Sequence, residues 1–192
     1  MPILARLTLS TLRLAVAALL LAWQAPAHAQ LIPVERSLEV QADPARVWEL
    51  AGGYCAVPDW DTVYKDCRVV LGSGSPGTVR RMAYKAGGLP AVDVLTDRGP
   101  YSYSYRKLSS HTRGRLQAMP GQEVGTTRVT WQVWLDPSAV PDGARAEYPD
   151  ALGDDMLAAL QRMKAQAEAA QQEAEEAAAR GPALIPPRAA RR

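Results

Sequence analysis

The chain has 192 residues, with 22 Lys and Arg against 20 Asp and Glu, and it contains no phenylalanine. Two of the arginines lie among the first 29 residues, which we expect to be cleaved, so about 163 residues with 20 charges of each sign remain. This balance argues against a nucleic-acid or anionic-membrane partner, because either would call for a basic face. The length is enough for one domain with a core and too short for two.

The N-terminal segment, residues 1–29, has the pattern of a secretory signal peptide. Arg6 and Arg13 precede an apolar run over residues 14–23, and residues 27–29 read Ala-His-Ala, the small-x-small sequence that signal peptidase accepts. A retained membrane anchor is the weaker alternative, because the run is shorter than the roughly 20 residues that cross a bilayer. We therefore expect a mature chain that does not span a membrane and is periplasmic or secreted.

The mature chain begins with signals for one strand and two short helices. Residues 33–41 alternate apolar and polar side chains, which is typical of a half-buried strand. Asp43 and Pro44 predict a helix start, with Asp43 as the cap, and Gly52-Gly53 ends this helix. A second short helix is predicted over residues 57–64.

Strand signals fill the next seventy residues or so. Clusters of Gly, Pro, Ser and Asp separate six predicted strands, over residues 67–71, 79–85, 91–96, 101–108, 112–119 and 127–135. The connections are short, whereas parallel neighbours need crossovers of a dozen residues or more. We therefore predict an antiparallel sheet of seven strands.

A long helix is predicted from about residue 149 to about residue 179. Its first half has an apolar stripe at helical spacing, formed by Leu152, Met156, Leu160 and Met163. Beyond Lys164 only alanine continues the stripe, so residues 166–180 are predicted to be a poorly buried helical extension. This extension either docks on another exported protein or, as we favour, is solvated. Residues 181–192 are predicted to be a disordered tail.

This order of elements predicts an α+β fold. A curved, seven-stranded antiparallel sheet wraps the long C-terminal helix, and the two short helices after the first strand close one end. A single helix does not fill the concavity of such a sheet, which favours an internal cavity.

Five short motifs stand in an order and at spacings that match a known family. They are Ala42-Asp43-Pro44-Ala45-Arg46-Val47-Trp48, Pro58-Asp59-Trp60, Gly77-Thr78-Val79-Arg80, Tyr101-Ser102-Tyr103-Ser104-Tyr105 and Arg128-Val129-Thr130-Trp131. The sequence from about residue 33 to 165 resembles the polyketide cyclase/dehydrase and lipid-transport branch of the START-like (SRPBCC) superfamily. The resemblance implies a helix-grip ligand-binding domain over residues 30–165, with a hydrophobic cavity between sheet and long helix. It implies no single reaction, because the superfamily includes carriers as well as cyclases.

Strand parity and the helix stripe indicate which side chains line that cavity. Parity groups Trp131 with Val133 on the last strand and Met82 with Tyr84 on the third. Tyr103 shares a face with Tyr101 and Tyr105, and that face is either inward, where hydroxyls orient a ligand, or an external aromatic ladder.

Trp60 lies on the short helix that lids the cavity in the family that the sequence resembles; the alternative is that it plugs the end of the barrel. The predicted ligand-binding residues are therefore Trp60, Met82, Tyr84, Tyr103, Trp131, Val133, Met156 and Leu160. The alternative for each of them is that it fills the core.

The sequence offers no convincing catalytic constellation. His111, the one histidine after residue 29, lies in a segment that reads as a turn or strand start. Asp93 is interpreted as part of an exposed cross-strand pair, with Arg81 nearby, and an inward position is the alternative. We predict no cofactor and no metal site, because the motifs for them are missing.

Cys55 and Cys67 are predicted to form a structural disulfide. An oxidising compartment favours their pairing, and their spacing fits no C-x-x-C site. Zinc would lack ligands, since the mature chain has a single histidine. Two free buried thiols are the alternative. A bridge would tie both ends of the short helix that carries Trp60.

These observations predict an exported binding protein for a small hydrophobic or amphipathic ligand. One alternative is a polyketide cyclase- or dehydratase-like enzyme that works through pocket tyrosines and one carboxylate or arginine. The other is an accessory protein of an exported complex, with residues 166–180 as its docking segment. Binding without catalysis is the interpretation that we favour.

Overall fold

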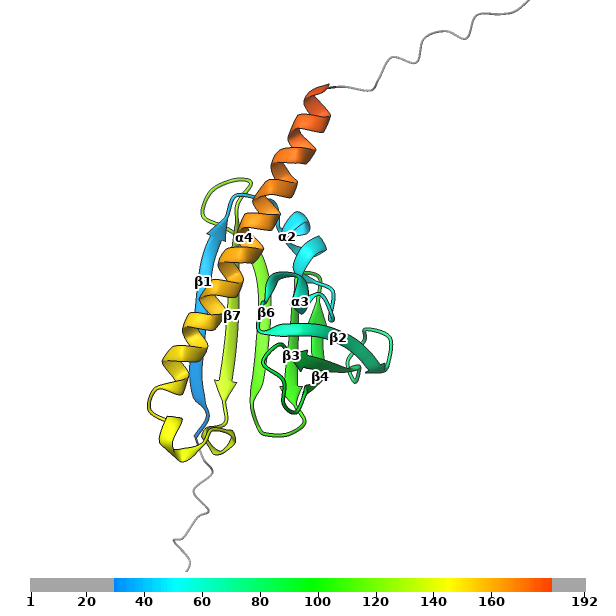
Figure 1. Ribbon diagram of the computed structural model, residues 1–192. Coiled ribbons are helices and arrows are strands. Elements are labelled where there is room, and N and C mark those ends of the chain that lie inside the picture. Colours follow the sequence, from blue (N-terminus) through cyan, green and yellow to red (C-terminus); the bar gives the residue numbers. More distant parts are fainter. Residues whose placement is uncertain (1–29, 181–192) are drawn as a thin grey trace, which may run out of the picture. The chain divides into compact units, whose positions relative to one another are not determined.

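A computed structural model describes residues 30–180 of the chain. The predicted signal peptide (1–29) and tail (181–192) lie outside the described residues. The elements, drawn in Figure 1, are β1 (Ile32–Val40), α2 (Pro44–Ala51), α3 (Val57–Trp60), β2 (Tyr64–Leu71), β3 (Val79–Tyr84), β4 (Ala91–Gly99), β5 (Ser102–Lys107), β6 (Arg113–Pro120), β7 (Thr127–Leu135), the 3-10 turns η1 (Pro137–Ala139) and η2 (Asp142–Ala144), and α4 (Tyr148–Arg180).

The seven strands form one antiparallel sheet in the order β1-β7-β6-β5-β4-β3-β2. The last strand, β7, therefore returns beside the first, and β1 and β2 are the two edge strands. α4 packs across β1 and β7 (Figure 1). The short helices α2 and α3 also contact α4. The predicted α+β helix-grip fold is confirmed.

Two local predictions about the short helices are wrong. The second helix ends at Trp60 instead of Tyr64, because Asp61 has extended backbone angles and its carboxylate accepts a hydrogen bond from the Val63 backbone N–H at 2.9 Å. Asp43 does precede α2, but its side chain makes no capping bond. Its carbonyl oxygen accepts from the Val47 N–H at 3.1 Å, and Pro44 sets the first turn.

The apolar stripe of α4 holds the helix on the sheet. Met156, Leu160 and Met163 are buried, and each such side chain contributes about 1.5–3 kcal/mol by burial. Ala167 is the last buried residue of α4. One residue further on, the Glu168 carboxylate accepts a hydrogen bond from the Gln41 backbone N–H at 2.7 Å. Among residues 30–180, no helix has the length and apolar character that crossing a membrane requires.

The predicted disulfide between Cys55 and Cys67 is present, and its Cα atoms are 5.2 Å apart. This distance is within the usual range for disulfides. The bridge links the segment between α2 and α3 to the middle of β2, which is an edge strand. Both ends of the four-residue helix α3 are thereby anchored, although a helix so short has little stability of its own.

The bridge leads to a testable expectation about stability. Replacing both cysteines, Cys55→Ser with Cys67→Ser, should lower the free energy of unfolding by about 3 kcal/mol, because a loop closed in the unfolded chain is released. Urea unfolding of variant and wild type measures the difference. Protein purified without reductant should show no thiol that reacts with iodoacetamide before reduction. Two alkylated cysteines in unreduced protein would contradict the assignment.

Candidate functional site

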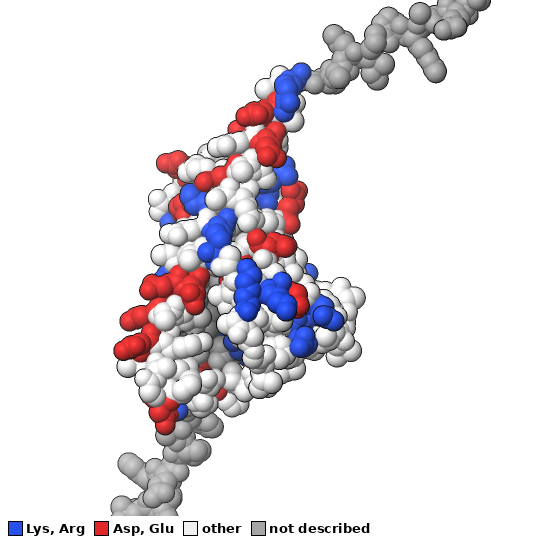
Figure 2. All heavy atoms as spheres, viewed as in Figure 1, with Lys and Arg blue, Asp and Glu red and all other residues white. Residues whose placement is uncertain are grey.

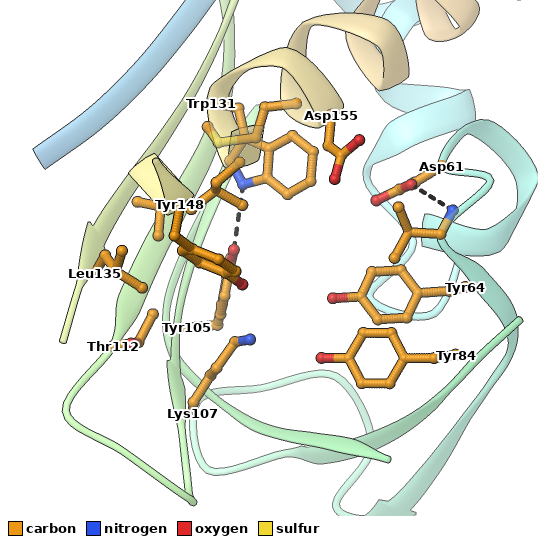
Figure 3. A pocket seen from close by; sticks show the side chains of 14 residues that line it. Asp61, Tyr64, Tyr84, Tyr105, Lys107, Thr112, Trp131, Leu135, Tyr148 and Asp155 are labelled. Atoms are coloured by element: carbon orange, nitrogen blue, oxygen red, sulfur yellow. Dashed lines mark hydrogen bonds between the residues drawn. The ribbon is translucent and has the colours of Figure 1, made fainter. Parts of the chain in front are cut away.

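A cavity of about 110 Å³ lies between the sheet and the first turns of α4. Its walls come from the α3–β2 connection, from β3, β5 and β7, and from α4 (Figure 3). Tyr148, at the start of α4, lines it while 39% exposed, so this residue is at the rim. In Figure 2 the surface is hollowed beside α4, with acidic side chains along the start of that helix and basic ones over the β2 region opposite.

Aromatic side chains form much of the wall. Tyr64 and Tyr84 are directly opposite each other in the β2–β3 pair, and their rings stack with centroids 5.1 Å apart. Across the cavity, Trp131 donates a hydrogen bond from its indole Nε1 to the hydroxyl of Tyr105 at 3.2 Å. Figure 3 shows the hydroxyl groups of Tyr64 and Tyr84 directed into the space between these two pairs.

Charged groups lie on two sides of the cavity. Lys107, at the end of β5, directs its ammonium inward, whereas Asp61 and Asp155 lie on the side of α3 and α4 (Figure 3). Burial raises the pKa of Asp61, and the neighbouring Asp155 adds to the effect, although the Val63 N–H and Arg162 oppose it. Asp61 therefore keeps a proton to a higher pH than an exposed aspartate does.

Deeper than the cavity, a recess of about 20 Å³ lies behind Tyr64, Tyr105 and Trp131. Its floor is the buried ion pair of Arg80 and Asp93, whose side chains are 3% and 1% exposed. The guanidinium donates to Asp93 Oδ2 from Nη2 at 3.0 Å and from Nε at 3.3 Å. The remaining volume is enough for one water molecule.

The guanidinium of Arg80 is held from several directions. It donates to the carbonyl oxygen of Tyr54 at 2.6 Å and lies 4.2 Å from the centroid of the Tyr54 ring and 5.1 Å from that of Tyr105. Burial acts to lower the pKa of Arg80, but the oxygens of Tyr103 and Asp93 outweigh it, so the pKa lies above its ordinary value. Arg80, in the floor of the recess, is therefore positively charged at every physiological pH.

Two polar atoms of the recess residues lack a hydrogen-bond partner among residues 30–180. They are Asp93 Oδ1 and Trp60 Nε1, and both residues are only 1% exposed. An unpaired buried polar atom costs about 1–3 kcal/mol. The recess, which shares Tyr64, Tyr105, Lys107 and Trp131 with the cavity, thus has one acceptor and one donor available among its lining residues.

Comparison with known proteins agrees with this geometry. Residues 32–168 match the family described as polyketide cyclase / dehydrase and lipid transport. The chain belongs to this family. The match spans every element from β1 into α4, including all the residues of the cavity and of the recess. No curated protein matches the chain.

Several solved structures have the same fold as this protein. The protein XoxI from Bacillus cereus is 21% identical, with a TM-score of 0.62 over 76% of this chain and 99% of that one. An uncharacterised protein from Bacillus thuringiensis is also 21% identical, with a TM-score of 0.59 over 70% and 98%. The Zhui aromatase/cyclase from Streptomyces is 17% identical, with a TM-score of 0.59 over 72% and 94%. These similarities establish the fold.

The structure places the predicted ligand-binding residues at three depths. Tyr84, Trp131, Val133 and Met156 line the cavity, while Trp60, Met82, Tyr103 and again Trp131 line the recess. Leu160 lines neither and is fully buried in the core. Trp60 packs edge-on against Trp131, with centroids 5.5 Å apart, and lines the recess instead of the cavity.

The interpretation of Asp93 as an exposed residue is wrong. Asp93 faces inward, and its partner is Arg80, because the β3–β4 register sets these two residues directly opposite each other. Arg81 has the opposite parity and is half-buried on the other side of the sheet. His111 is exposed, and its backbone N–H donates to Asp136.

Strand parity does carry the signal for the site residues that the sequence analysis missed. Arg80 alternates with Met82 and Tyr84 on β3, and Lys107 alternates with Tyr103 and Tyr105 on β5. The inward orientation of that tyrosine face is now observed for Tyr103 and Tyr105, which are buried. Asp61 and Tyr64 carried no such signal, since both fall in the segment predicted to be helical.

The buried pair leads to a second testable expectation. Arg80→Met should lower the free energy of unfolding by about 3–5 kcal/mol, because it leaves the carboxylate of Asp93 buried and unpaired. Adding Asp93→Leu should restore part of the loss, because no buried charge then remains. Urea unfolding measures both. Arg128→Met is the matched control, since its ion pair with Glu39 is 47% and 34% exposed and contributes at most about 1 kcal/mol. Equal losses in Arg80→Met and Arg128→Met would contradict this account.

Proposed function

We propose that this protein binds a small hydrophobic or amphipathic molecule in the cavity between the sheet and α4, and that it does so outside the cytoplasm. The observation that carries the proposal is the composition of the cavity wall. Tyrosine, tryptophan and aliphatic side chains surround a space that opens at Tyr148, and a few polar groups lie at defined points. Binding sites for small molecules have this character, with apolar walls for affinity and few polar groups for orientation.

The fold supports a cavity as a lasting feature of the molecule. α4 covers β1 and β7 with its apolar stripe. On the other side of the cavity, β3 and β5 carry polar inward residues, among them Arg80 and Lys107. Closing the cavity would bring apolar helix residues against the ammonium of Lys107 and the carboxylate of Asp61, which would lose their hydration. The charged groups therefore keep the space accessible to water or to a ligand.

Binding without catalysis accounts for the polar groups that the structure describes. His111 is exposed and does not line the cavity, although its chain neighbour Thr112 does. The carboxylate of Asp93 is engaged by Arg80. The cyclase/dehydratase alternative rests on Asp61, whose raised pKa suits a proton donor, and on the neighbouring Asp155, but among residues 30–180 no histidine or cysteine lines the cavity. We therefore propose a carrier or sensor of its ligand.

The disulfide supports the extracytoplasmic part of the proposal. Disulfides persist in oxidising compartments such as the periplasm and are reduced in the cytosol. The bridge between Cys55 and Cys67 leaves no free cysteine among the described residues. It agrees with the signal peptide predicted over residues 1–29. For residues 166–180 we propose a solvated extension of α4, because burial along this helix ends at Ala167.

A variant that fills the cavity tests the proposed function. Leu152→Trp adds an indole at a half-buried position of the cavity wall, so it should displace the ligand while α4 remains in place. After incubation with a bacterial lipid extract, native mass spectrometry should detect a bound small molecule on the wild type. The affinity of Leu152→Trp should be lower by about tenfold or more, which corresponds to about 1.4 kcal/mol, and its occupancy at a subsaturating amount of extract should fall with it.

The matched control is Leu71→Trp, which adds the same side chain at a position that is 65% exposed on β2. It should retain the occupancy of the wild type. Equal occupancy in the wild type and in Leu152→Trp would overturn the cavity as the binding site, and a wild type without bound mass in any preparation would overturn the proposed function.

A further inference from the structure

Lys107 is a charged side chain inside the cavity without an ionic partner. It ends β5 on the same face as Tyr103 and Tyr105, and it lines both the cavity and the recess. Figure 3 shows its ammonium directed into the open space. None of the salt bridges among residues 30–180 includes Lys107. A half-buried ammonium of this kind favours an anion beside it.

The charges at the inner end of the cavity do not balance. Lys107 is the register partner of Asp93, but both hydrogen bonds of the Asp93 Oδ2 atom come from Arg80. Two positive side chains therefore stand against one carboxylate. The acidic groups Asp61 and Asp155 lie on the opposite side, toward α3 and α4 (Figure 3), and Asp61 has Arg162 in its own surroundings. Among the described residues, Lys107 forms no ion pair with Asp61, Asp93 or Asp155.

The groups around Lys107 are hydrogen-bond donors. Tyr105 accepts from Trp131, which leaves its own proton free to donate into the cavity. The hydroxyl groups of Tyr64 and Tyr84 are directed to the same space (Figure 3). Burial holds the pKa of Tyr64 and of Tyr105 above the ordinary value, so both hydroxyls keep their protons at neutral pH. Three phenols and one ammonium match a carboxylate, which only accepts hydrogen bonds.

The apolar part of the cavity suits a single ring. The stacked rings of Tyr64 and Tyr84 form one wall and the indole of Trp131 forms the other. The volume is about 110 Å³, which is less than the roughly 150 Å³ of a protein cavity that holds benzene. The cavity is open at Tyr148, which is 39% exposed, so one end of a substituted ring would lie in the mouth. A single ring is therefore the largest ring system that these walls suit, since a fused-ring system or a long acyl chain would lie mostly outside them.

We propose that the ligand is a single-ring aromatic carboxylate, with its carboxylate on the ammonium of Lys107 and its ring between the Tyr64–Tyr84 pair and Trp131. This inference rests on the proposed function, because it names the class of molecule that occupies the same cavity. Neutral aromatic molecules lose the charge-assisted bond, and a ring that carries an alkylammonium group, such as protonated benzylamine, meets Lys107 with a like charge.

Calorimetric titration of the protein purified from the periplasm tests the inference with three probes of the same size, namely benzoate, benzyl alcohol and benzylamine. Benzoate should bind at least tenfold more tightly than either of the others. Lys107→Met should weaken benzoate binding at least tenfold and leave benzyl alcohol binding unchanged. Lys107→Arg should retain most of the benzoate affinity. Lys65→Met removes an exposed lysine of β2 and should change nothing.

The comparison among the three probes on the wild type decides the question even where Lys107→Met does not fold. Equal affinity for benzoate and benzyl alcohol would overturn the carboxylate assignment and leave the proposed function standing. Binding of a lipid-extract component without binding of any of the three probes would overturn the single-ring assignment. Absence of every bound molecule, from the extract and from the probes alike, would overturn both the inference and the proposed function.

Discussion

The buried ion pair of Arg80 and Asp93 is the constraint around which the cavity is organised. Two charges removed from water are tolerable only when each is paired and hydrogen-bonded. The β3–β4 register satisfies this by setting the two residues opposite each other, and the carbonyl oxygen and ring of Tyr54 complete the surroundings of the guanidinium. The pair thereby joins the segment after α2 to the inner face of the sheet.

A polar floor changes what the rest of the fold can do. Where α4 meets β1 and β7, fully buried apolar side chains such as Leu160 close the interface. Where the sheet presents Arg80 and Lys107, apolar helix residues cannot close onto it without removing charges from water. The space that remains is lined by tyrosines, whose rings cover apolar surface and whose hydroxyls face the polar groups. The inward residues of β3 and β5 thus account both for the position of the cavity and for its polarity.

Sequence patterns predicted the fold well and the site in part. The predicted bounds of β7, residues 127–135, match the structure, and those of α4 lie within one residue at each end, because alternation and the helical stripe are strong there. Parity also indicated Met82 and Tyr84. The same parity places Arg80 on the inward face, but we did not predict this residue to be inward because arginines on strands are usually exposed. Leu160 was predicted to bind the ligand and lies in the core instead. Helical spacing identifies the buried face of a helix but does not distinguish core residues from cavity residues. Asp61 escaped prediction because one side-chain bond to the Val63 N–H ends α3 early.

A crystal structure with 4-bromobenzoate would locate a ligand in the cavity beside Arg80 and Lys107. Anomalous scattering locates the bromine without reference to any expected pose. We expect one strong peak within the walls formed by Tyr64, Tyr84 and Trp131, with the bromine toward Tyr148 and the carboxylate density at Lys107. Bromine density only outside these walls, for example in the groove between α2 and the end of α4, would contradict the account.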